Sequence, residues 1–121
     1  MTEALLPTVE VLTGPAPTHA VIWLHGLGAD GHDFEPVVGE FDAARLPPTR
    51  FVYPHAPKRA VTINGGYVMR AWFDIYSRNY GNRAEDGEGT DASAAQVEAL
   101  IARENARGIP DERIVLAGFS Q

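Results

Sequence analysis

Two short apolar runs, each leading into a glycine turn, limit the fold of this chain more than any other feature. The first run is Ala20–Leu24, which leads into His25-Gly26, and the second lies within Arg113–Ala117 and leads into Gly118. Apolar runs of this length are typical of strands that are covered on both faces, as in parallel sheets. We therefore expect both segments to be strands of a largely parallel sheet.

The rest of the chain alternates between strand and helix signals. The expected elements are strands at 8–12, 20–24, 50–53 and 113–117, with helices from residue 32 or 33 to about 41 and from residue 90 or 91 to about 107. This order predicts an α/β domain whose mostly parallel central sheet carries helices on both faces. The stretch Pro54–Gly89 is expected to be an irregular loop with several aromatic side chains of its own.

Composition excludes several classes of protein. The chain has 121 residues, of which 45% are hydrophobic, and a formal net charge of −6. The apolar content is too high for a disordered segment, and the scattered basic residues form no stripe that would bind nucleic acid. The chain contains no cysteine, so disulfides, thiolate nucleophiles and cysteine-based metal sites are excluded.

The sequence also contains information on membrane-spanning segments and on the cellular compartment of the protein. The longest uninterrupted apolar run is Ala20–Leu24, which is far too short to span a membrane. The first residues, Met1–Ala4, lack the basic start and apolar core of a signal peptide. We therefore expect an acidic, cytoplasmic protein.

The first glycine turn matches the dinucleotide-binding pattern G-x-G-x-x-G over Gly26–Gly31 and lies between an expected strand and an expected helix. Two features argue against a nucleotide site. The strand ending at Tyr53 is followed by Pro54-His55 rather than by an acidic residue, and the helix begins with bulky residues near His32. A Rossmann-type nucleotide-binding domain is therefore an alternative, beside the simpler interpretation of a tight turn that needs glycine.

The same turn contains four side chains of the types that bind metal ions. The possible ligands there are His25, Asp30, His32 and Asp33. Their spacing matches neither a helical i, i+4 pair nor another known ligand pattern, so we expect no metal.

The second glycine turn, Gly118-Phe119-Ser120-Gln121, matches the first four residues of G-x-S-x-G. In that motif the serine lies on a strained turn between a strand and a helix, where its hydroxyl is exposed for nucleophilic attack. Acyl transfer also needs two N–H donors for the oxyanion, one after the nucleophile and one from a glycine-rich loop after an earlier strand. Gln121 and the His25-Gly26 loop supply both parts.

Five blocks, in the same order along the chain, carry a resemblance to a known family. They are His25–Gly28, Pro54–Pro57, Trp72–Asp74, Gly108–Pro110 and Gly118–Gln121. From about Val21 onward the chain resembles the acyl-protein thioesterase and carboxylesterase (phospholipase/carboxylesterase) family of α/β-hydrolases.

The resemblance implies a serine hydrolase that cleaves carboxylic esters or thioesters of apolar acyl chains without a metal or organic cofactor. Ser120 would be the nucleophile, and the backbone amides of Leu27 and Gln121 would form the oxyanion hole. The segment around Trp72 and Phe73 would border the acyl-binding groove. Met69 belongs to the same group of apolar residues, although such residues can also simply hold a long loop in place.

The resemblance also places the family's catalytic Asp and His after the serine in the chain, beyond residue 121. None of the four histidines in this sequence (His19, His25, His32 and His55) matches the family's general base. We therefore expect residues 1–121 to be the N-terminal portion of a single α/β-hydrolase domain, truncated after the strand that leads into Ser120 and inactive alone.

The expected partners are an acyl substrate and the C-terminal half of the same domain, on this or a separate chain. A homodimer is a further option. The competing hypothesis is an inert, truncated domain that only binds acyl ligands or a partner chain.

Overall fold

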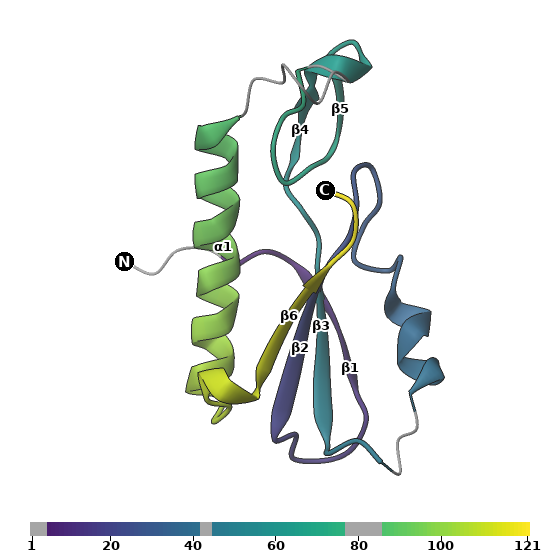
Figure 1. Cartoon of the computed structure of the whole chain (residues 1–121), viewed down its shortest axis with the longest axis vertical. Coiled ribbons are helices and arrows are strands. Elements are labelled where there is room, and N and C mark those ends of the chain that lie inside the picture. Colours follow the sequence, from purple (N-terminus) through teal and green to yellow (C-terminus); the bar gives the residue numbers. More distant parts are fainter. Residues whose placement is uncertain (1–4, 42–44, 77–85) are drawn as a thin grey trace.

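A four-stranded sheet with the order β1-β3-β2-β6 lies at the centre of the fold (Figure 1). Its strands are β1 (Thr8–Leu12), β2 (His19–Leu24), β3 (Thr49–Pro54) and β6 (Ile114–Gly118). Strands β3, β2 and β6 are parallel, and β1 pairs antiparallel with β3 at one edge. The computed structural model describes residues 5–41, 45–76 and 86–121. The mostly parallel sheet confirms the predicted α/β class.

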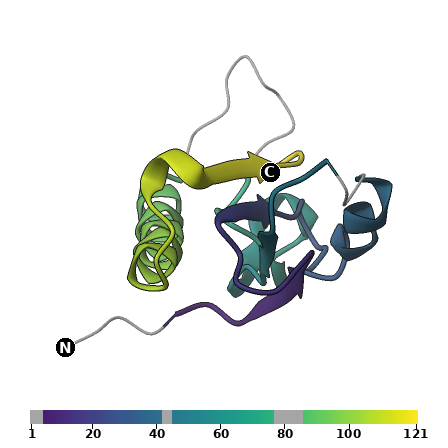
Figure 2. The same ribbon diagram turned by 90° about the horizontal axis from the view of Figure 1, so that it is seen from below.

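Helices of unequal length flank the two faces of the sheet. The long helix α1 (Gly87–Ala106) lies on one side, and the short helix η1 (Glu35–Glu40) lies on the other (Figures 1 and 2). Ile22 and Val52 are partners in the strand register, so both point to one face, where they pack with Leu100 of α1. All three are almost fully buried. Burial of such side chains, worth roughly 1.5–3 kcal/mol each, attaches α1 to the sheet.

The expected helix from residue 32 or 33 to about Phe41 is wrong in type and length. Only Glu35–Glu40 is helical, and it is a 3-10 helix with Pro36 in its first turn. Proline is tolerated in a first turn, but Val37, Val38 and Gly39 all have low helix propensity, so a full α-helix is not favoured here. Phe41 ends the element with an extended backbone and remains 42% exposed.

The start of the long helix also differs from the expectation of Thr90 or Asp91. Helix α1 begins at Gly87, and the Asp86 side chain caps it by accepting a hydrogen bond from the Gly89 amide at 2.9 Å. The second carboxylate oxygen of Asp86 accepts from the amide of Asp74 at 2.8 Å. One carboxylate therefore joins the helix N-terminus to the segment around Trp72.

The stretch expected to be irregular contains a β-hairpin. Strands β4 (Lys58–Val61) and β5 (Tyr67–Arg70) pair antiparallel, with the 3-10 helix η2 (Thr62–Asn64) between them. Gly65 and Gly66 follow with positive φ angles, which glycine adopts without steric cost. The hairpin lies beside the end of the sheet at which β2 and β6 finish (Figure 1).

A cluster of charged side chains, with Glu104 buried at its centre, joins the C-terminal part of α1 to the sheet. The carboxylate of Glu104 is fully buried and contacts Arg50 of β3 and Arg107. Glu10 of β1 lies 3.0 Å from Arg103 and 2.9 Å from Arg107. Buried ionic groups need such partners because an unpaired charge inside a protein is strongly unfavourable.

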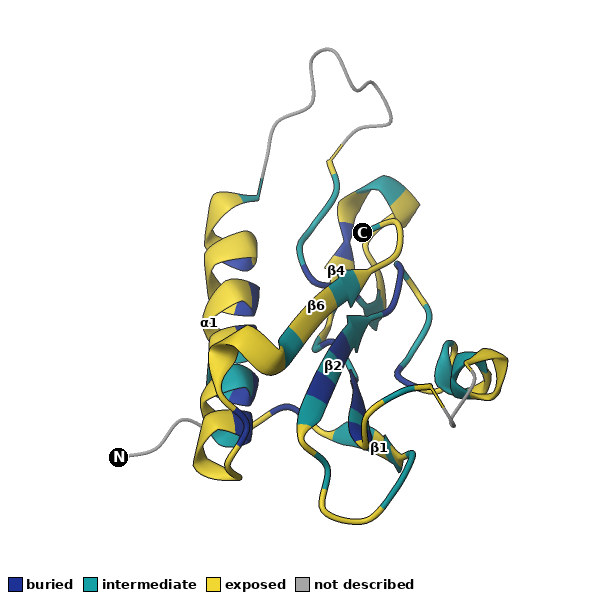
Figure 3. Cartoon of the chain, turned by 60° about the horizontal axis from the view of Figure 1, so that its bottom comes forward, coloured by how far each residue is buried: buried dark blue, intermediate teal, exposed yellow. Residues whose placement is uncertain are grey.

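Strand β6 is the least covered part of the sheet. Val115 and Leu116 are 57% and 54% exposed although they point to opposite faces. Figure 3 shows this exposure along β6, in contrast to the buried residues of β2. Among the described residues, β6 pairs only with β2. Within the same part of the chain, no helix is long and apolar enough to span a membrane.

Candidate active site

Ser120 lies on the tight turn directly after β6. Its φ angle is +63°, and Ala16 is the only other non-glycine residue with positive φ in the described ranges. An L-residue in this conformation costs of order 1–3 kcal/mol, and such strain persists only where the surrounding structure imposes it. Ser120 is also exposed. A strained, exposed serine at the end of a parallel strand has the local geometry expected for G-x-S-x-G.

The two glycine turns meet at this serine. Leu24 and Gly118 are register partners at the ends of β2 and β6, and the Phe119 amide donates to the Leu24 carbonyl at 3.2 Å. A Cβ atom on Gly26 would lie 3.4 Å from both the Phe119 carbonyl oxygen and the Ser120 Cβ. Parallel pairing of the two strands therefore brings the first loop against the serine turn.

His25 is a structural residue of the first loop. Its side chain is buried, its Nε2 accepts from the Ala56 amide at 3.0 Å, and its Nδ1 lies 2.7 Å from the Gly26 carbonyl oxygen. Because Nε2 accepts, Nδ1 carries the proton and donates to Gly26. Both ring nitrogens are thus occupied in holding the loop, which agrees with the expectation that His25 is no general base.

The amides of Leu27 and Gln121 lie on the two adjoining turns. In the part of the chain that the structure describes, neither amide donates a hydrogen bond to another residue. The next amide in the first loop, Gly28, instead donates to the Arg70 carbonyl of β5 at 2.9 Å, with a φ of +76° at Gly28. This bond holds the turn at the residue after Leu27.

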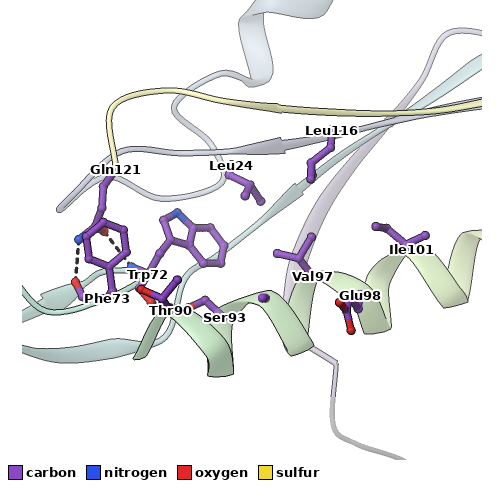
Figure 4. Close-up of a pocket in the computed structure, with 11 residues that line it drawn as sticks. Leu24, Trp72, Phe73, Thr90, Ser93, Val97, Glu98, Ile101, Leu116 and Gln121 are labelled. Atoms are coloured by element: carbon purple, nitrogen blue, oxygen red, sulfur yellow. Dashed lines mark hydrogen bonds between the residues drawn. The ribbon is translucent and has the colours of Figure 1, made fainter. Parts of the chain in front are cut away.

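Trp72 and Phe73 lie together beside the Gln121 side chain. They line an apolar groove of about 440 Å³ between β6 and α1 (Figure 4). The other apolar lining residues are Leu24, Ala94, Val97, Ile101 and Leu116. Met69, the third residue that we grouped with them, does not line this groove. Its sulfur lies against the first loop, 3.7 Å from where a Cβ on Gly28 would be.

Two of the remaining histidines, His32 and His55, lie near Gly31 with 5.5 Å between their ring centroids, whereas His19 begins β2 at the opposite end of that strand. His55 accepts from the Gly31 amide through Nδ1 at 3.0 Å, and burial lowers the pKa of its imidazole. His32 pairs with Glu35 at 3.0 Å. Among residues 5–41, 45–76 and 86–121, no side chain hydrogen-bonds the Ser120 hydroxyl, and no cluster of three potential ligands could hold a metal ion.

The nucleotide-binding alternative lacks the structural element that it needs. The glycine pattern is followed by a 3-10 helix of six residues, rather than by an α-helix whose N-terminus could bind a pyrophosphate. The third glycine, Gly31, has a packing role, since a Cβ there would lie 2.4 Å from the Tyr53 carbonyl oxygen. The glycine at this position lets the loop approach the end of β3.

Sequence reasoning missed two contacts at the site. The Gln121 side chain bonds the backbone of Trp72 and Phe73, and the Ser93 hydroxyl of α1 donates to the Trp72 carbonyl. The sequence holds no signal for either contact, because each joins segments far apart in the chain.

Comparison with known proteins is consistent with this geometry. Residues 8–121 match the model of the phospholipase/carboxylesterase family. The chain is 40% identical over 116 residues to "Acyl-protein thioesterase 1" of Yarrowia lipolytica, covering 95% of this chain and 51% of that protein. The crystal structure of Zea mays acyl-protein thioesterase 2 aligns with a TM-score of 0.75 and 34% identity, over 94% of this chain and 46% of that one. That of Arabidopsis thaliana SOBER1 aligns with a TM-score of 0.78 and 33% identity, over 84% and 49%.

The chain thus spans about half the length of the relatives that it matches. The structure and the sequence match agree. The mostly parallel sheet, with two glycine turns that meet at an exposed serine, is the arrangement expected for the family whose model the sequence matches. The chain belongs to the phospholipase/carboxylesterase family of α/β-hydrolases.

Proposed function

We propose that the protein is a serine hydrolase that cleaves carboxylic esters or thioesters of apolar acyl chains through an acyl-enzyme on Ser120. The observation that carries this proposal is the position of Ser120, exposed and in left-handed backbone conformation at the end of β6, in contact with the Gly26 loop. Family membership supports hydrolase chemistry, and the conformation of Ser120 supports its assignment as nucleophile.

In the proposed reaction, the Ser120 Oγ attacks the acyl carbonyl carbon, and the carbonyl π electrons move onto oxygen. The backbone amides of Leu27 and Gln121 donate hydrogen bonds to this oxyanion. When the tetrahedral intermediate collapses, the bond to the alcohol or thiol breaks, and the serine proton passes to the leaving group through a general base. Water then attacks the acyl-enzyme and releases the acid.

The general base and its carboxylate partner are proposed to lie beyond residue 121. The basis is the family's order of catalytic residues, together with the fact that relatives are about twice as long as this chain. No cofactor enters this mechanism, because a serine, a base and two backbone donors are sufficient for acyl transfer. A cytoplasmic location is also part of the proposal, as expected from the sequence.

The acyl chain is proposed to enter the groove beside Trp72 and Phe73, close to Gln121, whose side chain donates to the Phe73 carbonyl. The other end of the groove, at Val97, Ile101 and Leu116, is proposed to be covered by the C-terminal half of the domain. Exposed apolar residues on both faces of β6 support this division, since such a strand is stable only when it is covered and paired. A substrate-binding domain without catalysis is the alternative.

The test is to compare the full-length protein with its Ser120→Ala variant. We expect a fluorophosphonate probe to label the wild-type protein at Ser120, and we expect the variant to lose both labelling and p-nitrophenyl ester hydrolysis. Loss of a triad nucleophile lowers turnover by about a million-fold. Undiminished hydrolysis by the alanine variant would remove Ser120 as the nucleophile, and an inactive wild-type protein that still binds fatty acids would favour the alternative.

A further inference from the structure

The two turns that carry the proposed oxyanion donors are joined by one residue, Trp72. Its indole N–H donates to the His25 carbonyl of the first loop at 2.8 Å. Its backbone N–H donates to Oε1 of Gln121 on the serine turn, also at 2.8 Å. Trp72 itself is only 4% exposed and belongs to a buried cluster with Leu6 and Ala56. A single buried residue thus makes hydrogen bonds to both turns.

The Gln121 side chain completes this connection. While its oxygen accepts from the Trp72 amide, its Nε2 donates to the Phe73 carbonyl at 2.6 Å (Figure 4). The pair of bonds fixes the orientation of the amide, because the reverse orientation would place donor against donor and acceptor against acceptor. The side chain of the residue after the proposed nucleophile is therefore held at both polar atoms, which limits rotation of its own backbone N–H.

The backbone of Trp72 is in turn fixed by α1. The buried Ser93 hydroxyl donates to the Trp72 carbonyl. Each polar group of Trp72 consequently has a partner: the indole N–H contacts the first loop, the amide contacts the serine turn and the carbonyl contacts the helix. Buried polar groups that are all satisfied in this way specify one arrangement of their surroundings.

We propose that Trp72 and the Gln121 side chain are positioning residues that set the separation of the Leu27 and Gln121 amides, so that both donors reach one oxyanion. The inference rests on the proposed function and extends it, since it assigns the Trp72 indole a role in catalysis that differs from lining the acyl groove. Oxyanion donors act only when they are held at the position that the developing charge will occupy. A misplacement of about 1 Å can lower the rate by about 100-fold.

Two variants of the full-length protein separate this role from simple packing. Trp72→Phe retains an aromatic ring and removes the indole donor, and Gln121→Met retains chain length and the backbone amide but removes both side-chain bonds. We expect kcat for a p-nitrophenyl ester to fall by about 10- to 100-fold in each variant, with KM within about two-fold of wild type. Binding of a trifluoromethyl ketone, which forms a tetrahedral adduct, should weaken in parallel with kcat/KM.

Trp23→Phe is the matched control. Trp23 lies on β2 close to the same loop and stacks on Phe34 with 5.1 Å between ring centroids, but its indole N–H has no hydrogen-bond partner among the described residues. The same substitution therefore removes the same atoms without breaking a hydrogen bond, and kcat should remain within about two-fold of wild type.

The possible results distinguish the inference from the proposed function. Wild-type kcat in folded Trp72→Phe and Gln121→Met proteins would overturn the inference alone, as would an equal loss in Trp23→Phe. A change confined to KM would overturn it as well and would assign Trp72 to substrate binding only. A wild-type protein without hydrolysis and without labelling of Ser120 would overturn both. Should Trp72→Phe fail to fold, the kcat of Gln121→Met decides the matter.

Discussion

Replacement of Glu104 by alanine is expected to be among the most destabilising single changes in the protein. The Glu104 side chain is 1% exposed and is held between Arg50 and Arg107. Loss of its carboxylate leaves the Arg50 guanidinium, which is itself only 15% exposed, without its nearest anion. Removal of one partner from a buried ion pair typically costs about 3–5 kcal/mol.

The structure places the expected cost at the lower end of this range. Arg50 retains Glu10 at 3.6 Å, and Arg107 retains the same carboxylate at 2.9 Å, so neither arginine becomes fully unpaired. We therefore expect a loss of about 3 kcal/mol in the free energy of unfolding. For a protein of about twice this chain's length, each kcal/mol shifts Tm by roughly 2–4 °C, which gives a decrease of about 6–12 °C.

The assay is urea unfolding of the full-length protein, followed by far-UV circular dichroism, with thermal unfolding as a second measurement. Asp91→Ala is the control, because Asp91 lies exposed on the same helix and does not line the groove, and its replacement should change stability by no more than about 0.5 kcal/mol. A Glu104→Ala protein within 1 kcal/mol of wild type would show that the charge cluster does not attach α1 to the sheet.

Two further predictions concern the helix cap and the uncovered strand. The backbone amides of Asp74 and Gly89 donate hydrogen bonds to Asp86, and these bonds lower the pKa of the Asp86 carboxyl below the ordinary 3.8. The stabilisation by the ionised Asp86 carboxylate is therefore fully present above pH 3.8. It is lost as the pH falls through the lower pKa of the folded state. Asp86→Asn should accordingly reduce Tm at pH 7, and the difference from wild type should shrink as the pH is lowered below 3.8; a difference independent of pH would contradict this explanation. Residues 1–121 expressed alone should aggregate or melt without cooperativity, because Val115, Leu116 and Phe119 are more than half exposed around β6. Ultracentrifugation and circular dichroism test this, and a monomeric fragment that melts cooperatively would contradict it.

The elements that could be predicted are those whose signals are local. The apolar run of β2 and that of β6 specify strands through side-chain type alone, and the glycines that follow mark where the strands end. The Gly-x-Ser spacing likewise indicated the turn in which Ser120 adopts positive φ. The family followed from five such local blocks, and the comparison with relatives confirmed it.

Other features were beyond prediction because they depend on contacts across the fold. The first residue of α1 is determined by Asp86, whose second oxygen is held by the amide of Asp74, so the helix starts earlier than Thr90. The hairpin of β4 and β5 is a different case, because a local signal was present: its Gly65-Gly66 turn could have revealed it. Its strands have few buried residues and hence little apolar alternation.

The sequence by itself therefore determined the class of fold, the position of Ser120 and the family. Only the tertiary structure decided that Glu104 is buried between two arginines and that Trp72 connects the two glycine turns. The physical reason is the range of each interaction. Backbone preferences and apolar periodicity act over a few residues, whereas the partner of a buried polar group is set by which distant segments the sheet and helix bring together.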